Sequence, residues 1–199
     1  ALHGAGGEWR VDRPRLRWRI LDAFIDAAEQ AGIPRSVDFN TGDNEGCGYF
    51  DVNQKRGRRW SAARGFLQPA LKRRNLVVLT RALAERVVIE DGRATGVVIR
   101  QDGQALRLRA RAEVIVSTGA VATPALLERS GIGDGNRLRQ LGIDVARHLP
   151  GVGENLQDHL QLRPIFKVSG VPTLNMQYRS LLRRGLMGAE YALLRRGAM

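Results

Sequence analysis

The chain has 199 residues, a formal net charge of +12 and an apolar share of 43%. That apolar share supplies a core for one large domain or two small ones and excludes wholesale disorder. The single cysteine, Cys47, excludes an internal disulfide, and no apolar run approaches the ~20 residues of a membrane span. We therefore expect a cytoplasmic protein without a stable membrane span. Membrane association through its basic tail stays possible.

The positive charge comes almost entirely from arginine, which is spread over the whole chain, whereas lysine occurs at only three positions. A nucleic-acid-binding protein concentrates its basic residues on one face and carries a recognition motif, and neither is visible here. We therefore expect no nucleic-acid partner. A basic module for nucleic acid or membrane surfaces remains the alternative to an enzyme.

Residues 1–74 read as a Gly-rich loop followed by two helices. Apolar residues recur at helical spacing over residues 16–30, and Gly32 and Pro34 end that run. A loop rich in Asp, Asn and Gly follows over residues 35–57. A second helix then begins near Ser61, a suitable N-cap, and Pro69 should kink or split it.

Residues 75–160 change from helical to alternating periodicity. A short strand is expected over residues 75–80. Asp91-Gly92 and Asp102-Gly103 are dipeptides typical of two-residue hairpin turns, so a three-stranded antiparallel meander should follow. The run Val114–Ser117 lacks alternation, as in a strand buried on both faces.

The stretch "GAVATPALLERSGIG" comes directly after that apolar run. Thr123 is a good N-cap, Pro124 suits the first helical position and Gly131 a left-handed C-cap, so we expect a short helix over residues 124–130. A strand, a glycine turn and a helix N-terminus present backbone N–H groups to a ligand. Beyond it we expect a helix and loop, a strand over residues 162–168 and a basic helical tail.

The same stretch resembles the second sequence signature of the glucose–methanol–choline (GMC) family of FAD-dependent oxidoreductases. Two further stretches agree with the family in order and spacing: "RGRRWSAARGFLQPALKRRNLVVLT" and "HLPGVGENLQDH". The opening "HGAGGEWRV" is similar to the family's His-Gly segment, with Glu8 where many members have proline. The signature's fixed positions are occupied by Gly119, Ala120, Thr123, Pro124, Leu126, Leu127, Ser130, Gly131, Ile132 and Gly133.

The resemblance implies a mixed α/β fold: part of an FAD-binding Rossmann-like domain with an antiparallel meander, and the start of a substrate-binding domain. On this view residues 1–74 connect the two domains, residues 75–160 belong to the FAD-binding domain, and residues 161–199 begin the substrate-binding domain. It also implies an FAD-dependent enzyme that oxidises the CH–OH group of a small alcohol, with choline the nearest guess and the electron acceptor open.

Two parts that the family needs are absent from the sequence: the G-x-G-x-x-G turn that holds the FAD pyrophosphate, and the segment with the catalytic histidine. We therefore expect an internal part of a longer enzyme, inactive alone and completed by N- and C-terminal parts of the same chain. A degenerate, inactive remnant or a purely structural domain would also be compatible with the sequence.

The resemblance also selects the candidate cofactor-binding residues. The strand-to-helix turn and the loop after the signature helix would meet the FAD, and Ala84 stands where the family often has a valine whose backbone contacts adenine. Ordinary packing is the alternative for each. Adjacent residues on an extended loop point in opposite directions, so Asp158 and His159 are not expected to form a catalytic pair. We expect no catalytic or metal-binding residue, and the cofactor candidates are Ala84, Ser117, Thr118, Gly119, Ala120, Asn155 and Asp158.

Overall fold

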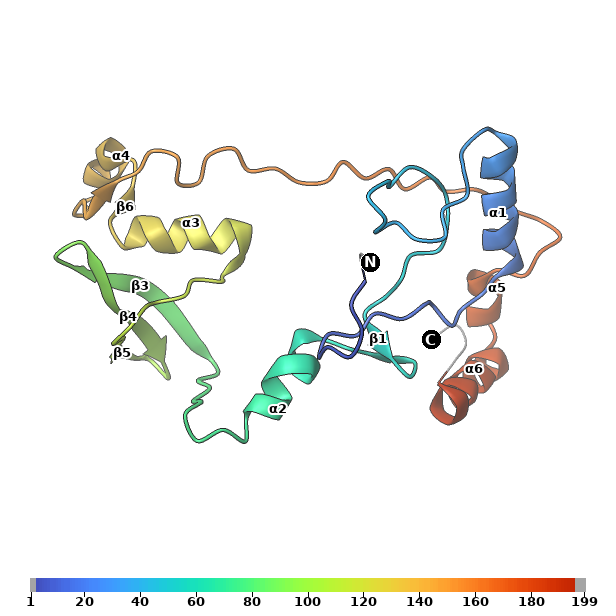
Figure 1. Ribbon diagram of the computed structural model, residues 1–199, viewed down its shortest axis with the longest axis horizontal. Coiled ribbons are helices and arrows are strands. Elements are labelled where there is room, and N and C mark those ends of the chain that lie inside the picture. Colours follow the sequence, from blue (N-terminus) through green and yellow to red (C-terminus); the bar gives the residue numbers. More distant parts are fainter. Residues whose placement is uncertain (1–2, 196–199) are drawn as a thin grey trace. The chain divides into compact units, whose positions relative to one another are not determined.

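A computed structural model describes residues 3–195 of the protein. The chain divides into two compact units (Figure 1): unit 1 comprises residues 1–77 and 164–199, and unit 2 comprises residues 78–163. We describe each unit by itself. The division into an FAD-binding part and the start of a substrate-binding domain stays a prediction.

Unit 2 is built on a three-stranded antiparallel sheet of order β3-β4-β5. Its strands are β3 (Ala82–Glu90), β4 (Arg93–Gln101) and β5 (Gln104–Arg109). Both connecting turns place an Asp-Gly pair in the left-handed region, with φ of +50° and +75° at Asp91-Gly92 and +50° and +81° at Asp102-Gly103. The predicted meander is confirmed, and its turns have the conformation that selects Asp-Gly.

Helix α3 (Gly119–Arg129) packs against β3, and α4 (Gly135–Gln140) follows it. Two short parallel strands, β6 (Ile132–Gly133) and β7 (Arg147–His148), join the residues after α3 to those after α4. The core lies between the sheet and these helices. Its buried apolar residues are Val87, Val88, Ile99, Leu126 and Leu138.

Three predicted strands are wrong in the structure: residues 75–80, Val114–Ser117 and 162–168 form no ladder. Most of their apolar side chains are exposed, including Val77 at 78%, Ile115 at 78% and Ile165 at 96%, whereas Val114 and Val116 are half-buried. A strand needs a neighbour to accept its backbone hydrogen bonds, and none of residues 3–195 pairs with these segments.

The signature helix also differs from its prediction at one end. It begins at Gly119 and not at Pro124, so Thr118 occupies the N-cap and Pro124 lies inside the helix. Pro124 is the sixth helical residue, so its missing N–H removes one internal hydrogen bond, the one to the Ala120 oxygen. The predicted C-cap is confirmed: Gly131 has φ +81°, and its N–H donates to the Glu128 oxygen at 2.9 Å.

Unit 1 contains short elements separated by long loops. Helix α1 (Arg19–Gln30) matches the first predicted helix and ends before Gly32, whose φ is +84°. The second predicted helix is split in two, a π-helical turn η1 (Ala63–Leu67) and a short α2 (Gln68–Ala70) that contains Pro69. The remaining elements are β1 (Gln54–Lys55), β2 (Arg58–Arg59), α5 (Leu174–Tyr178) and α6 (Leu181–Leu194).

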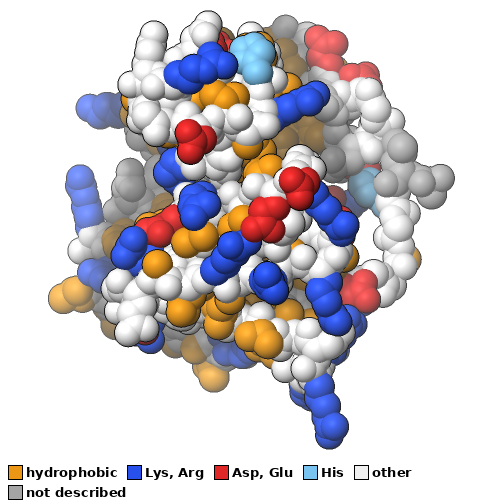
Figure 2. Space-filling model, turned by 90° about the vertical axis from the view of Figure 1, so that its left-hand side faces the viewer, with side chains coloured by type: hydrophobic (Ala, Val, Ile, Leu, Met, Phe, Trp, Pro, Cys, Tyr) orange, Lys and Arg blue, Asp and Glu red, His pale blue; other side chains and the backbone are white. Residues whose placement is uncertain are grey.

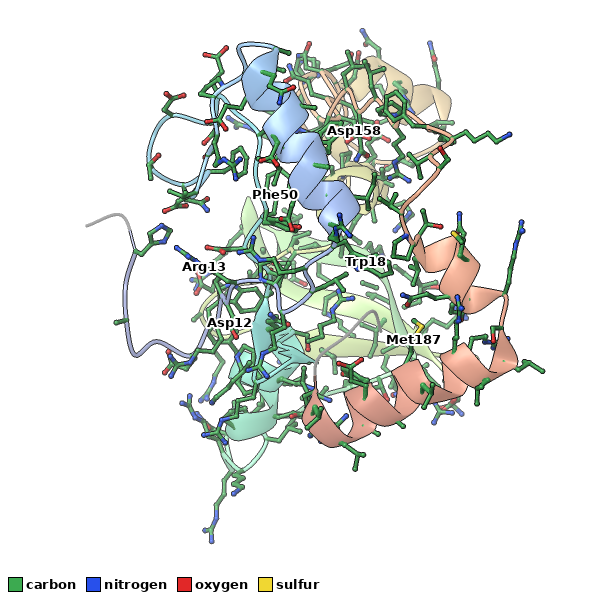
Figure 3. All side chains as sticks on the ribbon, turned by 90° about the vertical axis from the view of Figure 1, so that its right-hand side faces the viewer. Asp12, Arg13, Trp18, Phe50, Asp158 and Met187 are labelled. Atoms are coloured by element: carbon green, nitrogen blue, oxygen red, sulfur yellow. The ribbon has the colours of Figure 1, made fainter. Side chains whose placement is uncertain are left out.

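Contacts between distant residues hold unit 1 together. Asp12 and Val52 exchange two backbone hydrogen bonds of 3.0 Å, and Trp60 Nε1 donates to the Glu8 oxygen at 2.7 Å. Only Ile25 and Met187 are buried apolar residues among the described residues of this unit, and Figure 3 shows Met187 on the inner side of α6. The predicted tail helix is confirmed up to Leu194; its last residues lie outside the described part of the chain. No helix among residues 3–195 is both long and apolar enough to cross a membrane.

Candidate functional site

The four candidates Ser117 to Ala120 lie together at the N-terminus of α3, and all four are exposed. Thr118 is the N-cap residue but makes no side-chain cap hydrogen bond; its hydroxyl instead lies 2.9 Å from that of Thr123. The first N–H groups of α3 are therefore left to external acceptors. Such a helix end favours a negatively charged or strongly accepting ligand.

Gly119 keeps the space beside this turn open. Its φ is +85°, a conformation that side-chain-bearing residues rarely adopt, and no protein atom lies within 4 Å of the position that a Cβ would take. A side chain there would project into the open space. The absence of a Cβ therefore lets a ligand approach the backbone closely, as a nucleotide does at a strand-to-helix turn.

The C-terminal end of α3 is fixed to the sheet by two side chains. Ser130 Oγ accepts the Val87 N–H at 2.8 Å and donates to the Leu126 oxygen at 2.6 Å, and Arg129 Nε donates to the Glu85 oxygen at 2.9 Å. Sequence reasoning placed Ser130 only within the signature. The signal that sequence reasoning missed is a hydroxyl at the C-terminal end of a helix. Such a hydroxyl can accept a free N–H group of an edge strand. These bonds orient the helix whose other end carries the candidate turn.

Ala84 lies on β3, the strand on which α3 packs. It pairs with Ile99 of β4, and the register then shifts between Ala84 and Arg86, which makes Glu85 a β-bulge. A bulge bends its strand and frees backbone groups from the ladder, and the Glu85 oxygen is the one that Arg129 binds. The helix contacts of this part of β3 are with the C-terminal end of α3, and no contact of the described residues joins Ala84 to Ser117–Ala120.

The loop after β7 returns to α3. A Cβ on Gly153 would lie 3.6 Å from the Cβ of Pro124, so the loop lies against the middle of the helix, two residues before Asn155. Asn155 has φ +56° and is exposed. No contact of the described residues joins Asn155 to Ser117–Ala120, and its role as a cofactor contact stays a prediction.

Asp158 lies further along this loop and is labelled in Figure 3. Its Oδ1 accepts the backbone N–H of His159 at 2.8 Å, so the contact between these neighbours is a local turn and not a pairing of two side chains. Asp158 is exposed, and no contact of the described residues joins it to Ser117–Ala120. Its role as a cofactor contact stays a prediction.

The face of unit 2 shown in Figure 2 carries basic side chains, all of them arginines in this unit, mixed with acidic and apolar ones. Several arginines of this unit are paired: Arg100 Nε donates to Glu85 at 2.6 Å, Arg107 binds Glu90, and Arg137 lies 3.6 Å from Glu128. Paired arginines add little net field. The candidate site therefore depends on backbone groups and open space rather than on a concentrated positive surface.

A sequence model described as GMC oxidoreductase matches residues 7–161, which include α3, the meander and the loop after β7. The chain belongs to this family. An oxygen-dependent choline dehydrogenase from Sinorhizobium medicae is 42% identical over 204 residues, covering 98% of this chain and 37% of that protein. The mitochondrial choline dehydrogenase of Homo sapiens is 46% identical over 159 residues, covering 80% of this chain and 27% of that protein. The chain thus spans 37% and 27% of the lengths of these two curated relatives.

Solved structures of this family resemble the fold. A fungal aryl-alcohol oxidase matches with a TM-score of 0.78 at 29% identity, covering 97% of this chain and 34% of that one. A pyridoxine 4-oxidase from Mesorbium loti matches with a TM-score of 0.67 at 30% identity, covering 74% of this chain and 29% of that one. An FAD-dependent oxidoreductase from Chaetomium thermophilum matches with a TM-score of 0.86 at 24% identity, covering 98% of this chain and 35% of that one. At this identity the likeness is one of fold alone. The predicted GMC fold class, mixed helices and antiparallel strands, is confirmed.

Proposed function

We propose that this chain forms one wall of the FAD site of an oxidoreductase that acts on the CH–OH group of a small alcohol. The observation that carries the proposal is the turn before α3. It combines an uncapped helix N-terminus, a glycine at φ +85° and open space beside the backbone, all within the segment that matches the GMC family. Relatives named choline dehydrogenases favour a choline-like alcohol.

The residues of this chain fit the adenosine end of FAD. Backbone N–H groups of Gly119 and Ala120 suit ribose or phosphate oxygens, because they are free at the start of α3. The hydroxyls of Ser117 and Thr118 add hydrogen-bonding groups, and the loop that contains Asn155 lies against the middle of the same helix. When bound, FAD supplies the hydride acceptor for alcohol oxidation. We assign no catalytic residue within this chain: its part is to bind and orient the cofactor.

The test uses the full-length protein and enlarges a side chain beside the turn. Ala120→Leu should weaken FAD binding about tenfold or more, because a bulky side chain enters the space of the adenosine and costs about 1.4 kcal/mol or more. The matched control is Val121→Leu, one residue on, where the side chain is already 77% exposed. Flavin absorbance per protein and fluorescence titration measure both.

Equal FAD affinity in the two variants, with unfolding midpoints unchanged, would show that the cofactor does not lie at this turn. A tenfold loss confined to Ala120→Leu supports the proposal. Loss of FAD with a lowered unfolding midpoint would call for the smaller change Ala120→Val, which should weaken binding by less and in the same direction.

A further inference from the structure

Six basic side chains line two pockets of unit 1, which we together call the basic hollow. The pockets have volumes of about 380 and 390 Å³, and Arg58, Arg64 and Arg195 line both. Ser61, Trp60 and Tyr191 complete the walls. The six basic residues are Lys55, Arg56, Arg58, Arg59, Arg64 and Arg195.

Direct backbone packing builds this hollow. A Cβ on Gly57, in the turn between β1 and β2, would overlap the backbone oxygen of Arg195. Tyr191 Oη donates to the Gly57 oxygen at 3.3 Å. The hairpin turn is therefore seated against the C-terminal end of α6, although 134 residues separate Gly57 from Tyr191. The hollow is a product of the tertiary fold and not of a basic run in the sequence.

Two of the cations lie over aromatic rings, and each ring is held in place by a hydrogen bond to a backbone oxygen. Lys55 Nζ lies 4.6 Å from the centre of the Trp60 ring, whose Nε1 donates to the Glu8 oxygen at 2.7 Å. Arg195 Cζ lies 5.2 Å from the centre of the Tyr191 ring. Such contacts restrict the side chains without neutralising their charge. The positive groups are thus held near one another.

No ion pair or hydrogen bond found among residues 3–195 involves the side chain of any of the six, although the Arg64 backbone N–H donates to Ser61 Oγ at 3.4 Å. Other arginines of the same unit form ion pairs: Arg35 binds Asp26 at 2.5 Å and Glu29 at 3.3 Å, and Arg17 Nη1 lies 4.0 Å from Asp22. Like charges that share a hollow without a counter-ion repel one another. An anion at this place would relieve the repulsion, and guanidinium groups favour oxyanions that accept two parallel hydrogen bonds.

We propose that the basic hollow binds a phosphate group, through the forked donors of Arg58, Arg59 and Arg64 with the Ser61 hydroxyl beside them. This site is on unit 1, and none of its residues belongs to the proposed adenosine contact on unit 2. The phosphate belongs either to a free anion or to a larger phosphorylated ligand. The recognising chemistry is the same in both cases.

Inorganic phosphate and pyrophosphate are the probes, titrated calorimetrically into the full-length protein freed of flavin, at 50 and 200 mM NaCl. The double variant Arg58→Gln/Arg59→Gln should weaken phosphate binding about tenfold or more, because hydrogen bonds to charged groups contribute about 1.5–3 kcal/mol each. The matched control is Arg73→Gln/Arg74→Gln. It removes the same charge from an exposed pair in the same unit that does not line the hollow.

Equal weakening in both double variants would overturn the proposal, because it would show attraction to net charge alone. Undiminished binding in Arg58→Gln/Arg59→Gln would overturn it as well. Should the glutamine variant fold poorly, Arg58→Lys/Arg59→Lys replaces it. That variant keeps the charge and loses the fork, so it should bind phosphate more weakly than the parent but more tightly than a glutamine variant.

Repeating the titration with the flavin-loaded protein distinguishes the sources. Competition between FAD and phosphate would assign the bound phosphate to the cofactor, whereas unchanged phosphate binding would assign it to a separate anion. Phosphate binding is measured on flavin-free protein, whereas the adenosine contact is tested by FAD affinity. A protein that binds no phosphate can therefore still bind FAD at the turn before α3, and a protein that binds no FAD there can still bind phosphate.

Discussion

Unit 2 is smaller than unit 1, and the two are held together differently. Unit 2 has a sheet whose neighbours in sequence are neighbours in space, a helix packed on it, and five of the seven buried apolar residues found among residues 3–195. Unit 1 has short elements, two buried apolar residues and long-range contacts such as Asp12 with Val52 and Tyr191 with Gly57. Closing long loops costs chain entropy, which the small core of unit 1 offsets poorly.

The difference teaches that unit 2 carries its own stability, whereas unit 1 depends on a few tertiary contacts. The two can be followed separately, because Trp9, Trp18 and Trp60, the three tryptophans of the chain, all belong to unit 1. Tryptophan fluorescence therefore reports unit 1. Hydrogen exchange of the amides of β3 and β4 reports unit 2.

The largest effect is expected from emptying the core of unit 2. Leu138 is fully buried, so Leu138→Ala should lower the free energy of unfolding of unit 2 by about 4 kcal/mol. Leu141→Ala, three residues on at a side chain that is 61% exposed, is the control and should change it little. Urea unfolding followed by exchange of the β3 amides measures both. A matching shift of tryptophan fluorescence would break the comparison, since it would mean that the units unfold together.

A smaller loss is expected at the turn that ends α3. Gly131 has φ +81°, and a Cβ there would overlap the Asp144 oxygen and lie 2.9 Å from the Ala146 nitrogen. Gly131→Ala should cost about 3 kcal/mol, from a left-handed backbone and a forced shift of its neighbours. Gly142→Ala is the control, because φ is +72° there but no atom lies within 4 Å. Thermal unfolding would contradict the interpretation if the two variants lost equal stability.

The next largest loss of stability is expected from breaking the link between α3 and the sheet. Ser130→Ala removes the acceptor of the Val87 N–H, which is partly buried, and should cost about 1–3 kcal/mol. Ser130→Thr keeps the hydroxyl and is the control. Amide exchange at Val87 should quicken in the alanine variant alone. An unchanged rate there would mean that water replaces the serine without cost.

The smallest effect concerns pH. The Arg107 guanidinium holds the pKa of the Glu90 carboxyl below its ordinary value. A lowered pKa in the folded state gives stability that is present above the unfolded value, about 4.3, and lost as the pH falls through the folded value. Glu90→Gln should flatten the pH dependence of unit 2 unfolding below about pH 5. Glu113→Gln, an exposed residue outside every ion pair found among residues 3–195, should leave the dependence as it is.

The sequence alone predicted the features that local chemistry decides. The Asp-Gly pairs specify the two hairpin turns, the helical spacing specifies α1, and Gly131 specifies the end of α3. The signature stretch led to the family, which the match over residues 7–161 establishes. Each of these depends on residues within a few positions of one another, so no knowledge of the rest of the fold was needed.

Only the tertiary structure decided which extended runs pair and which side chains share a site. Val114–Ser117 has the composition of a buried strand, but a strand forms only where a neighbour accepts its hydrogen bonds. The start of α3, the Ser130 link to β3 and the contact of Gly153 with Pro124 likewise depend on packing. The basic hollow joins Arg58 to Arg195 across most of the sequence. Local propensity acts over a few residues, whereas burial and charge act between whatever residues the fold brings together.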